Sequence, residues 1–182
     1  CLVILIVIQT LAAMKMSVLN KLLEQRAYTD AHTGLPNKDA CEVLLNNKET
    51  VAKHTACIMF DLNNLKIIND TKGHSKGDQL ILNFARLLRN VIPQKDFVGR
   101  YGGDEFMAVI YNTSKTEIED ILKQLSREKD RLNSSGNNMP IDYACGWAIS
   151  DADSECTIQM LLDKADYYMY ENKQAYKKSK KS

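Results

Sequence analysis

The sequence predicts an α+β fold with a central, mostly antiparallel or mixed sheet that carries helices on one face. Apolar runs of strand length alternate with amphipathic stretches of helical length, and after a leading helix their order is β-α-β-β-α-β. The 182 residues suffice for one domain with an extension, and 45% hydrophobic and 26% charged residues are typical of a globular core. Five scattered cysteines without a CxxC pair favour a reducing cytosol and argue against a disulfide framework or a zinc site.

Residues 1–27 differ from the rest of the chain because they open with an apolar run that has no charge before Lys15. The run is shorter than the ~20 residues that cross a bilayer. We interpret it as the end of a transmembrane segment in an inner (cytoplasmic) membrane protein; a buried amphipathic or signal-like segment is the alternative. The helix that follows carries a four-three seam, which favours pairing with a second copy or docking on its own domain. The seam consists of Ala12, Met16, Leu19, Leu23 and Arg26.

A domain is expected over residues 28–178, followed by a basic tail at 179–182. Its first segment, residues 30–37, is a turn-rich connector in which a glycine and a proline end one helix and Asn37 can cap the next. This boundary separates the N-terminal membrane and signalling helix from the part of the chain that we expect in the cytoplasm.

The first expected strand is the continuous apolar run of residues 56–60, which closes on Asp61. Such a run is typical of a strand buried on both faces, here with an acid at its carboxyl end. A polar segment, residues 63–77, follows it. The apolar face of residues 80–91 then predicts a helix, which Pro93 ends.

A hairpin is expected over residues 97–111, where apolar strand formers flank a Gly-Gly pair. Ser114 and Glu117 have the spacing of a capping box and predict the start of another helix. Residues 141–149 alternate large with small side chains, which indicates a strand whose small face lets a helix pack closely. The last helix is expected from about Thr157.

Two acids, Asp104 and Glu105, stand at the tip of the expected hairpin beside Gly102 and Gly103. Adjacent strand residues point to opposite faces, so the two acids share one ligand only if the turn bends them together. The glycines would let a large group lie directly on the backbone, and paired acids suit a hard divalent cation that holds phosphates. An exposed acidic turn is the alternative.

Three spaced motifs resemble those of the GGDEF-domain diguanylate cyclases. The string Arg100–Phe106 resembles the family's signature, residues 61–78 resemble D-x-D-x-F-K-x-x-N-D-x-x-G-H-x-x-G-D, and residues 165–173 resemble a third motif. The resemblance covers roughly residues 28–178. It implies a nucleotidyl-cyclase or palm-like fold with a ferredoxin-like β-α-β-β-α-β core, and a homodimer that condenses two GTP into cyclic di-GMP with release of two pyrophosphates.

The resemblance also implies a site for Mg²⁺ or Mn²⁺. The family's metal ligands fall on Asp61, the Leu62 carbonyl, Asp104 and Glu105, and its catalytic positions fall on the last two of these. In the family the residue at Asp104 is also implicated in activating the attacking 3′-hydroxyl. Mg²⁺ takes oxygen ligands and leaves positions for triphosphate oxygens and water. A cap at the end of a strand is the alternative for Asp61 taken alone.

Further residues are implied to bind the nucleotide. Asn69 and Asp78 fall on the family's guanine positions: a carboxylate accepts from N1–H and the exocyclic amine, and an amide both donates and accepts at N3 and the amine. Lys173 and Lys177 are four residues apart on the last helix, so both ammonium groups can face the triphosphate; a solvated basic helix end is the alternative. Additional phosphate contacts are expected from Asn63, Asn64, Leu65, Lys66, Gly102 and Gly103.

The chain departs from the family pattern at several positions. Asn63 and Leu65 stand where the family has Asp and Phe. Lys177 stands where it has Arg, so binding of the γ-phosphate is expected to be weaker. The window of the family's R-x-x-D inhibitory site reads Pro93-Gln-Lys-Asp96, so product inhibition is expected to be weak or missing. We expect activity to be retained; a degenerate domain that binds GTP or dimerises is the alternative. No pattern of aromatic and basic residues favours a nucleic-acid partner.

Overall fold

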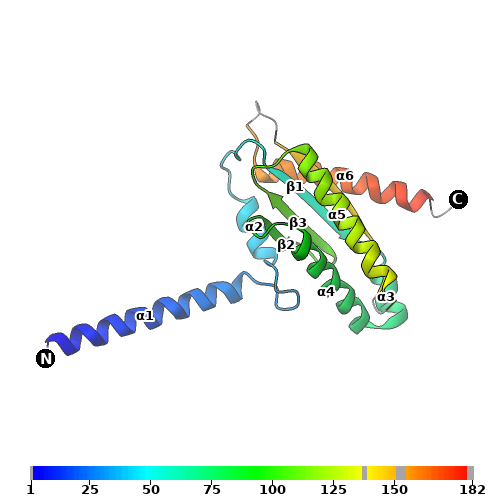
Figure 1. The fold of residues 1–182 in the computed structure, drawn as a ribbon. Helices are drawn as coiled ribbons and strands as arrows, with labels where there is room; N and C mark the ends of the chain where they lie inside the picture. Colours follow the sequence, from blue (N-terminus) through cyan, green and yellow to red (C-terminus); the bar gives the residue numbers. More distant parts are fainter. Residues whose placement is uncertain (1, 137–138, 151–154, 180–182) are drawn as a thin grey trace.

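The computed structural model describes residues 2–136, 139–150 and 155–179 (Figure 1). Within them, four strands form one antiparallel sheet in the order β2-β3-β1-β4. The strands are β1 (Ala56–Leu62), β2 (Phe97–Arg100), β3 (Glu105–Ile110) and β4 (Tyr143–Ile149). The expected α+β class and the expected hairpin, β2 with β3, are confirmed.

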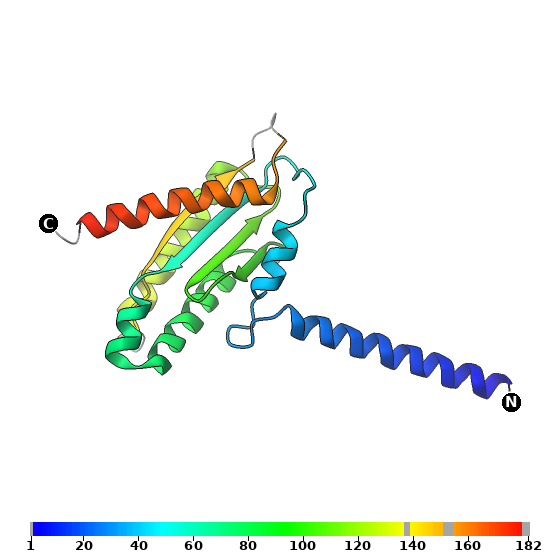
Figure 2. The same ribbon diagram turned by 180° about the vertical axis from the view of Figure 1, so that it is seen from behind.

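Helices cover both faces of this sheet. The domain's helices are α2 (Lys38–Leu45), α3 (Leu65–Lys72), α4 (His74–Val91), α5 (Lys115–Ser134) and α6 (Ile158–Ser179). Figure 1 shows α4 and α5 over one face, and Figure 2 shows α6 over the other. The prediction of helices on one face is therefore wrong. The physical reason is the continuous apolar run of β1, because a strand that is apolar on both sides needs cover on both.

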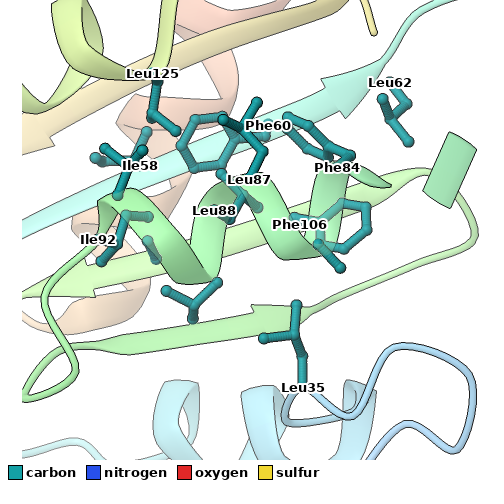
Figure 3. Close-up of a cluster of buried hydrophobic side chains, with 14 of the residues drawn as sticks. Leu35, Ile58, Phe60, Leu62, Phe84, Leu87, Leu88, Ile92, Phe106 and Leu125 are labelled. Carbon is teal, nitrogen blue, oxygen red and sulfur yellow. The ribbon is translucent and has the colours of Figure 1, made fainter. Parts of the chain in front are cut away.

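The side chains of β1 alternate between two hydrophobic clusters. Ile58, Phe60 and Leu62 pack toward α4 and α5, whereas Cys57 and Met59 pack toward α6. Figure 3 shows the first cluster, in which Phe84 of α4 lies between Phe60 and Phe106. These rings meet edge to face, with centroids 6.0 and 5.1 Å from Phe84. The aromatic contacts fix α4 against the centre of the sheet.

Helix α6 lies close to β4 because the strand presents small side chains to it. Ala144 and Ala148 belong to the cluster under α6, and between them lies Gly146. A methyl group at Gly146 would overlap the backbone nitrogen of Met169 and the carbonyl oxygen of Ala165. The expected close packing of a helix on this strand is confirmed, and it sets the depth at which α6 carries its other side chains.

The polar segment expected at residues 63–77 is helical. It contains all of α3, and α4 begins at His74, earlier than the apolar face of that helix predicts. Ile68 is the one buried side chain of α3, which explains why apolar periodicity did not reveal this helix. Gly73, with a φ of 84°, separates the two helices. The expected caps are confirmed: Asn37 accepts from the Ala40 amide, and Ser114 forms a capping box with its partner Glu117.

The N-terminal helix α1 (Leu2–Ala27) projects away from the domain (Figures 1 and 2). All of its described side chains are exposed, so in this structure they do not dock on the domain. By length and composition Ile6–Ala27 could cross a membrane, with a mean hydropathy of 1.3, although a signal sequence passes the same test. The pairing of this helix with a second copy and the boundary at residue 28 stay predictions.

Candidate active site

Strand pairing brings two of the predicted acids together. Asp61, near the end of β1, pairs with Glu105, the first residue of β3. Direct partners on antiparallel strands share a face, so both carboxylates point to the side of the sheet that α6 covers. The Leu62 amide donates to the Asp104 carbonyl oxygen over 2.9 Å, which holds the hairpin tip beside the end of β1. Sheet register, rather than a bend between Asp104 and Glu105, thus assembles the acidic group.

Lys173 of α6 reaches the same acids. Its ammonium donates to Oδ2 of Asp61 over 2.6 Å. The Asp61 side chain is only 10% exposed, and its Oδ1 is buried without a hydrogen-bond partner among the described residues. A cavity of about 450 Å³ opens here. Its walls are Asp61, Glu105, Asp163, Asp166, Tyr167, Met169, Tyr170, Lys173 and Gln174.

The cavity has an excess of negative charge. Burial raises the pKa of Glu105, and the carboxylates of Asp104, Asp61 and Asp166 raise it further. The Lys173 ammonium acts in the opposite direction but does not cancel the rise. A bound cation would relieve this repulsion, because it favours the ionised form of every nearby carboxyl group.

The residues present fit a divalent cation that completes its coordination with other oxygens. Asp61 Oδ1 is a buried carboxylate oxygen without a partner in the described part of the chain, and a hard cation takes such ligands. Within that part, no three His, Cys, Asp or Glu side chains converge closely enough to hold an ion by themselves. Backbone carbonyls, water and phosphate oxygens would therefore complete the shell, as is usual for Mg²⁺.

The two hairpin glycines serve different purposes. A methyl group at Gly102 would overlap Oε2 of Glu105, so Gly102 makes room for that carboxylate. The amides of Tyr101 and Gly102 both donate to the Glu105 carbonyl oxygen, over 2.9 and 3.1 Å. Around Gly103 nothing lies within 4 Å of the position a methyl group would take. The backbone at Gly103 is thus open to a large group, as expected, whereas the space beside Gly102 is taken by Glu105.

The connector, residues 30–37, holds the β2–β3 hairpin in position through Arg100. Arg100 donates to the Gly103 carbonyl oxygen over 2.8 Å and forms an ion pair with Asp30 at 3.2 Å. Burial alone would raise the pKa of Asp30, but hydrogen bonds from Thr33 and the Arg100 charge outweigh it and lower the pKa. Asn37 donates to the carbonyl oxygen of Ala27, the last residue of α1. One short segment therefore contacts both the N-terminal helix and the glycine turn.

The two predicted guanine residues lie on the helices that follow β1. Asn69 belongs to α3, and its Oδ1 is buried without a partner among the described residues. A methyl group at Gly77 would overlap this oxygen, so the glycine makes room for the amide. Asp78 of α4 is exposed, and the His32 ring donates from Nε2 to its carbonyl oxygen over 3.0 Å. The Asp78 side chain is thus accessible to a ligand, whereas the Asn69 Oδ1 is a buried acceptor without a partner among the described residues.

The other predicted phosphate contacts differ in exposure. Asn63 is buried, and its side-chain Nδ2 has no partner in the described part of the chain. Its backbone N–H donates to the Asp142 carbonyl oxygen over 2.9 Å. Asn64 and Lys66 are exposed, and Leu65 begins α3. Lys177 lies in α6, but its side chain is outside the described part.

Sequence reasoning assigned no role to two acids of the cavity wall, Asp163 and Asp166. They share a helix face with Tyr170 and Lys173, because the four residues follow one another at spacings of three, four and three. That spacing, read backwards from Lys173, is the signal that could have found them. Both residues are exposed, and both line the open cavity beside Asp61 and Glu105.

Known proteins resemble this chain in sequence and fold. Residues 27–179 match the family model described as "Diguanylate cyclase, GGDEF domain". The diguanylate cyclase DgcP of Escherichia coli is 29% identical over 88% of this chain and 48% of its own length. The cyclic di-GMP phosphodiesterase PdeB of Shewanella oneidensis is 32% identical over 79% of this chain and 17% of its own length. The chain spans less than half the length of either curated relative.

A crystal structure also shares the fold. It contains the coiled coil and GGDEF domain of DgcB from Caulobacter crescentus in complex with c-di-GMP. It superimposes with a TM-score of 0.77 and 23% identity, covering 92% of this chain and 91% of that one. This likeness confirms the cyclase-type fold that the sequence predicts.

Proposed function

Because the chain belongs to the family of diguanylate cyclase GGDEF domains, we propose that it condenses two molecules of GTP into cyclic di-GMP. Each 3′-hydroxyl attacks the α-phosphorus of the other nucleotide, so two O–P bonds form and two pyrophosphates leave. The observation that carries this proposal is the pair formed by the buried Asp61 and the half-buried Glu105, which Lys173 alone does not neutralise. Such a group suits a metal-bound triphosphate better than a structural ion pair.

Asp61, Asp104, Glu105 and the Leu62 carbonyl would hold Mg²⁺ or Mn²⁺. When bound, the metal neutralises triphosphate oxygens and makes the α-phosphorus more electrophilic. Asp104 is partly exposed at the hairpin tip, and there it takes the proton of the attacking 3′-hydroxyl. The buried, unpartnered oxygen of Asp61 supports its role as a ligand.

Recognition of GTP is divided between base and phosphates. Asn69 and Asp78 bind the guanine edge, which selects GTP over ATP. The open backbone at Gly103, next to Gly102, admits a phosphate group. Lys173 contributes a positive charge toward the triphosphate, and further phosphate contacts come from Asn63, Asn64, Leu65, Lys66 and Lys177.

Two copies of the domain must meet for the reaction, because each copy holds one GTP. The exposed apolar side chains of α1 favour a role outside the domain, in a membrane and in pairing with a second copy. Pairing of the helices raises the effective concentration of the two half-sites. In this arrangement α1 anchors the protein in the cytoplasmic membrane and residues 28–178 act in the cytoplasm.

Product inhibition is weak or missing in this proposal. A cavity of about 510 Å³ is lined by Pro93, Gln94 and Asp96 together with Arg89 of α4. No arginine stands at Pro93, and the Arg89 guanidinium already donates to the Gly34 carbonyl oxygen over 2.7 Å. Preincubation with cyclic di-GMP should therefore leave the rate of turnover nearly unchanged.

A second candidate is a degenerate domain that binds GTP or dimerises without turnover. It is favoured by the similarity to a protein named as a phosphodiesterase, in which a sequence like this one forms 17% of the length. The replacements at Asn63, Leu65 and Lys177 point the same way.

Incubation of the full chain with GTP and Mg²⁺, followed by identification of the product by mass spectrometry, separates the two candidates. The proposal predicts cyclic di-GMP and pyrophosphate from the wild type, and formation of both about 100- to 1000-fold more slowly by Asp104→Ala, which serves as the matched control. GTP binding without any cyclic dinucleotide, even at high protein concentration, would support the degenerate domain instead.

A further inference from the structure

We infer that Lys173 is the counter-ion of Asp61 in the metal-free protein, and that it gives up this contact when a divalent cation binds. The ammonium then becomes free to pair with the triphosphate. The inference rests on the proposed function, because it assigns two successive partners to a lysine of that site. It makes Lys173 a residue that couples metal binding to nucleotide binding.

The geometry of the ion pair supports the first partner. The Lys173 ammonium is 2.6 Å from Asp61 Oδ2, and the side chains are 26% and 10% exposed. Among the described residues nothing hydrogen-bonds the second oxygen, Asp61 Oδ1. The lysine is thus the contact that compensates the buried charge of Asp61 in this structure. A cation that binds Asp61 competes with it.

The charge balance of the cavity explains why a divalent cation would displace the Lys173 ammonium from Asp61. Among the described side chains, its walls carry the carboxyl groups of Asp61, Glu105, Asp163 and Asp166 and the ammonium of Lys173. A double charge in place of a single one at Asp61 reduces the repulsion among these acids further. The other wall residues are uncharged: Tyr167, Met169, Tyr170 and Gln174.

The exchange requires motion of a side chain only. Helix α6 packs closely on β4, since the backbone at Ala165 and Met169 lies against Gly146 with no space for even a methyl group, and the exchange does not depend on a movement of this helix. A lysine carries its charge on a flexible four-carbon stem, and this one is partly exposed toward the cavity. The ammonium can therefore leave Asp61 while the helix stays in place.

Release of Lys173 couples the affinity for metal to the binding of nucleotide. Without nucleotide, metal binding leaves the Lys173 ammonium without its acidic partner, which weakens metal affinity. A triphosphate supplies a new partner, so metal and nucleotide strengthen each other's binding. Removal of the lysine charge should improve metal binding when no nucleotide is present, the opposite of its expected effect on GTP affinity.

Titration of the full chain in detergent with Mn²⁺, followed by electron paramagnetic resonance without nucleotide, tests this. Lys173→Met should bind Mn²⁺ about five-fold more tightly than the wild type, the factor that corresponds to about 1 kcal/mol for a partly exposed ion pair. Lys164→Met, which removes the same charge from an exposed position of α6, should change the affinity much less. Asp61→Asn should lose most of the binding.

The outcomes distinguish this inference from the proposed function. Unchanged or weaker binding by Lys173→Met, together with loss of binding by Asp61→Asn, would overturn the exchange and leave the metal site standing. Full Mn²⁺ binding by Asp61→Asn would overturn the metal site and the exchange together.

Amine acetylation of the wild type gives a second measurement that needs no variant. Mn²⁺ should increase acetylation of Lys173 severalfold and leave Lys164 unchanged, as read by mass spectrometry of the α6 peptides. Equal acetylation of Lys173 with and without Mn²⁺ would contradict its release.

Discussion

The acidic cavity and the predicted guanine residues lie at neighbouring parts of the fold but are built in different ways. Asp61 and Glu105 are direct partners on central strands, and backbone hydrogen bonds fix their relation. Asn69 and Asp78 lie on the consecutive helices α3 and α4, where Gly77 makes room for the side-chain amide of Asn69. The first region has repelling charges and a partly buried ion pair, whereas the second has one buried amide oxygen and one exposed carboxylate.

This difference indicates which of the two regions holds its residues more rigidly. Phosphoryl transfer is sensitive to small displacements of the reacting atoms, so its residues belong on paired strands or directly beside them, as Asp104 does. Recognition of a base depends on a few hydrogen bonds and tolerates a less rigid support. We therefore expect changes at the acidic cavity to act on turnover and changes at the helices to act on affinity for GTP.

The largest expected effect comes from Asp104→Ala. Loss of this carboxylate should lower kcat about 100- to 1000-fold, the range found when one group that stabilises a transition state is removed. The melting temperature should stay near that of the wild type, because Asp104 is partly exposed. Steady-state kinetics and circular dichroism melts measure the two effects. Substantial activity in a folded variant would remove Asp104 from the chemistry.

The next effect concerns the support of Lys173. Gly146→Ala would insert a methyl group into the backbone of α6 and should lower the free energy of unfolding by about 1–3 kcal/mol, as overpacking does. Gly103→Ala is the matched control, since its methyl group meets open space. Urea unfolding of both variants checks this, and equal stabilities would contradict the close contact of α6 with β4.

Much of this architecture could be predicted from the sequence. The hairpin, the caps and the close approach of α6 depend on local patterns around Asn37, Ser114 and Gly146, so they could be read from short windows. Helix α3 could not, because Ile68 alone marks its buried face. The assignment of helices to one face of the sheet failed although the apolar run of β1 already required two covered faces.

The candidate site divides in the same way. Its acids could be named from motifs, but the pairing of Asp61 with Glu105 depends on strand register, which no local pattern specifies. The contact of Lys173 with Asp61 joins residues that are 112 positions apart. Asp163 and Asp166 enter the cavity only because α6 is seated so closely on β4. The roles of all these residues in binding and catalysis stay predictions.

A moderate effect is expected at the predicted guanine residues. Gly77→Ala should force Asn69 to another rotamer and raise the KM for GTP about five- to ten-fold, equivalent to one weakened hydrogen bond. The kcat should change little, and helix stability should not fall, because alanine is the better helix former. A loss of kcat without a change in KM would contradict the division between the two regions.

The smallest effect is on stability and depends on pH. The raised pKa of Glu105 means that its ionised form is disfavoured in the folded, metal-free protein. Glu105→Gln should therefore raise the free energy of unfolding at pH 7, and this gain should vanish below about pH 4.5, where the carboxyl is protonated in both states. Urea unfolding across this pH range checks the sign. Destabilisation at pH 7 would indicate that Glu105 has a favourable partner instead.

The most direct test of the division between chemistry and recognition compares GTP with inosine triphosphate, which has the same triphosphate but lacks the exocyclic amine of guanine. Formation of cyclic dinucleotides is measured for both substrates with Mg²⁺ and the full chain. We predict cyclic products from both, with similar kcat and a KM for inosine triphosphate that is about ten-fold higher, the cost of a lost hydrogen-bond partner. No cyclic product from GTP, or equal KM values for the two substrates, would contradict the account.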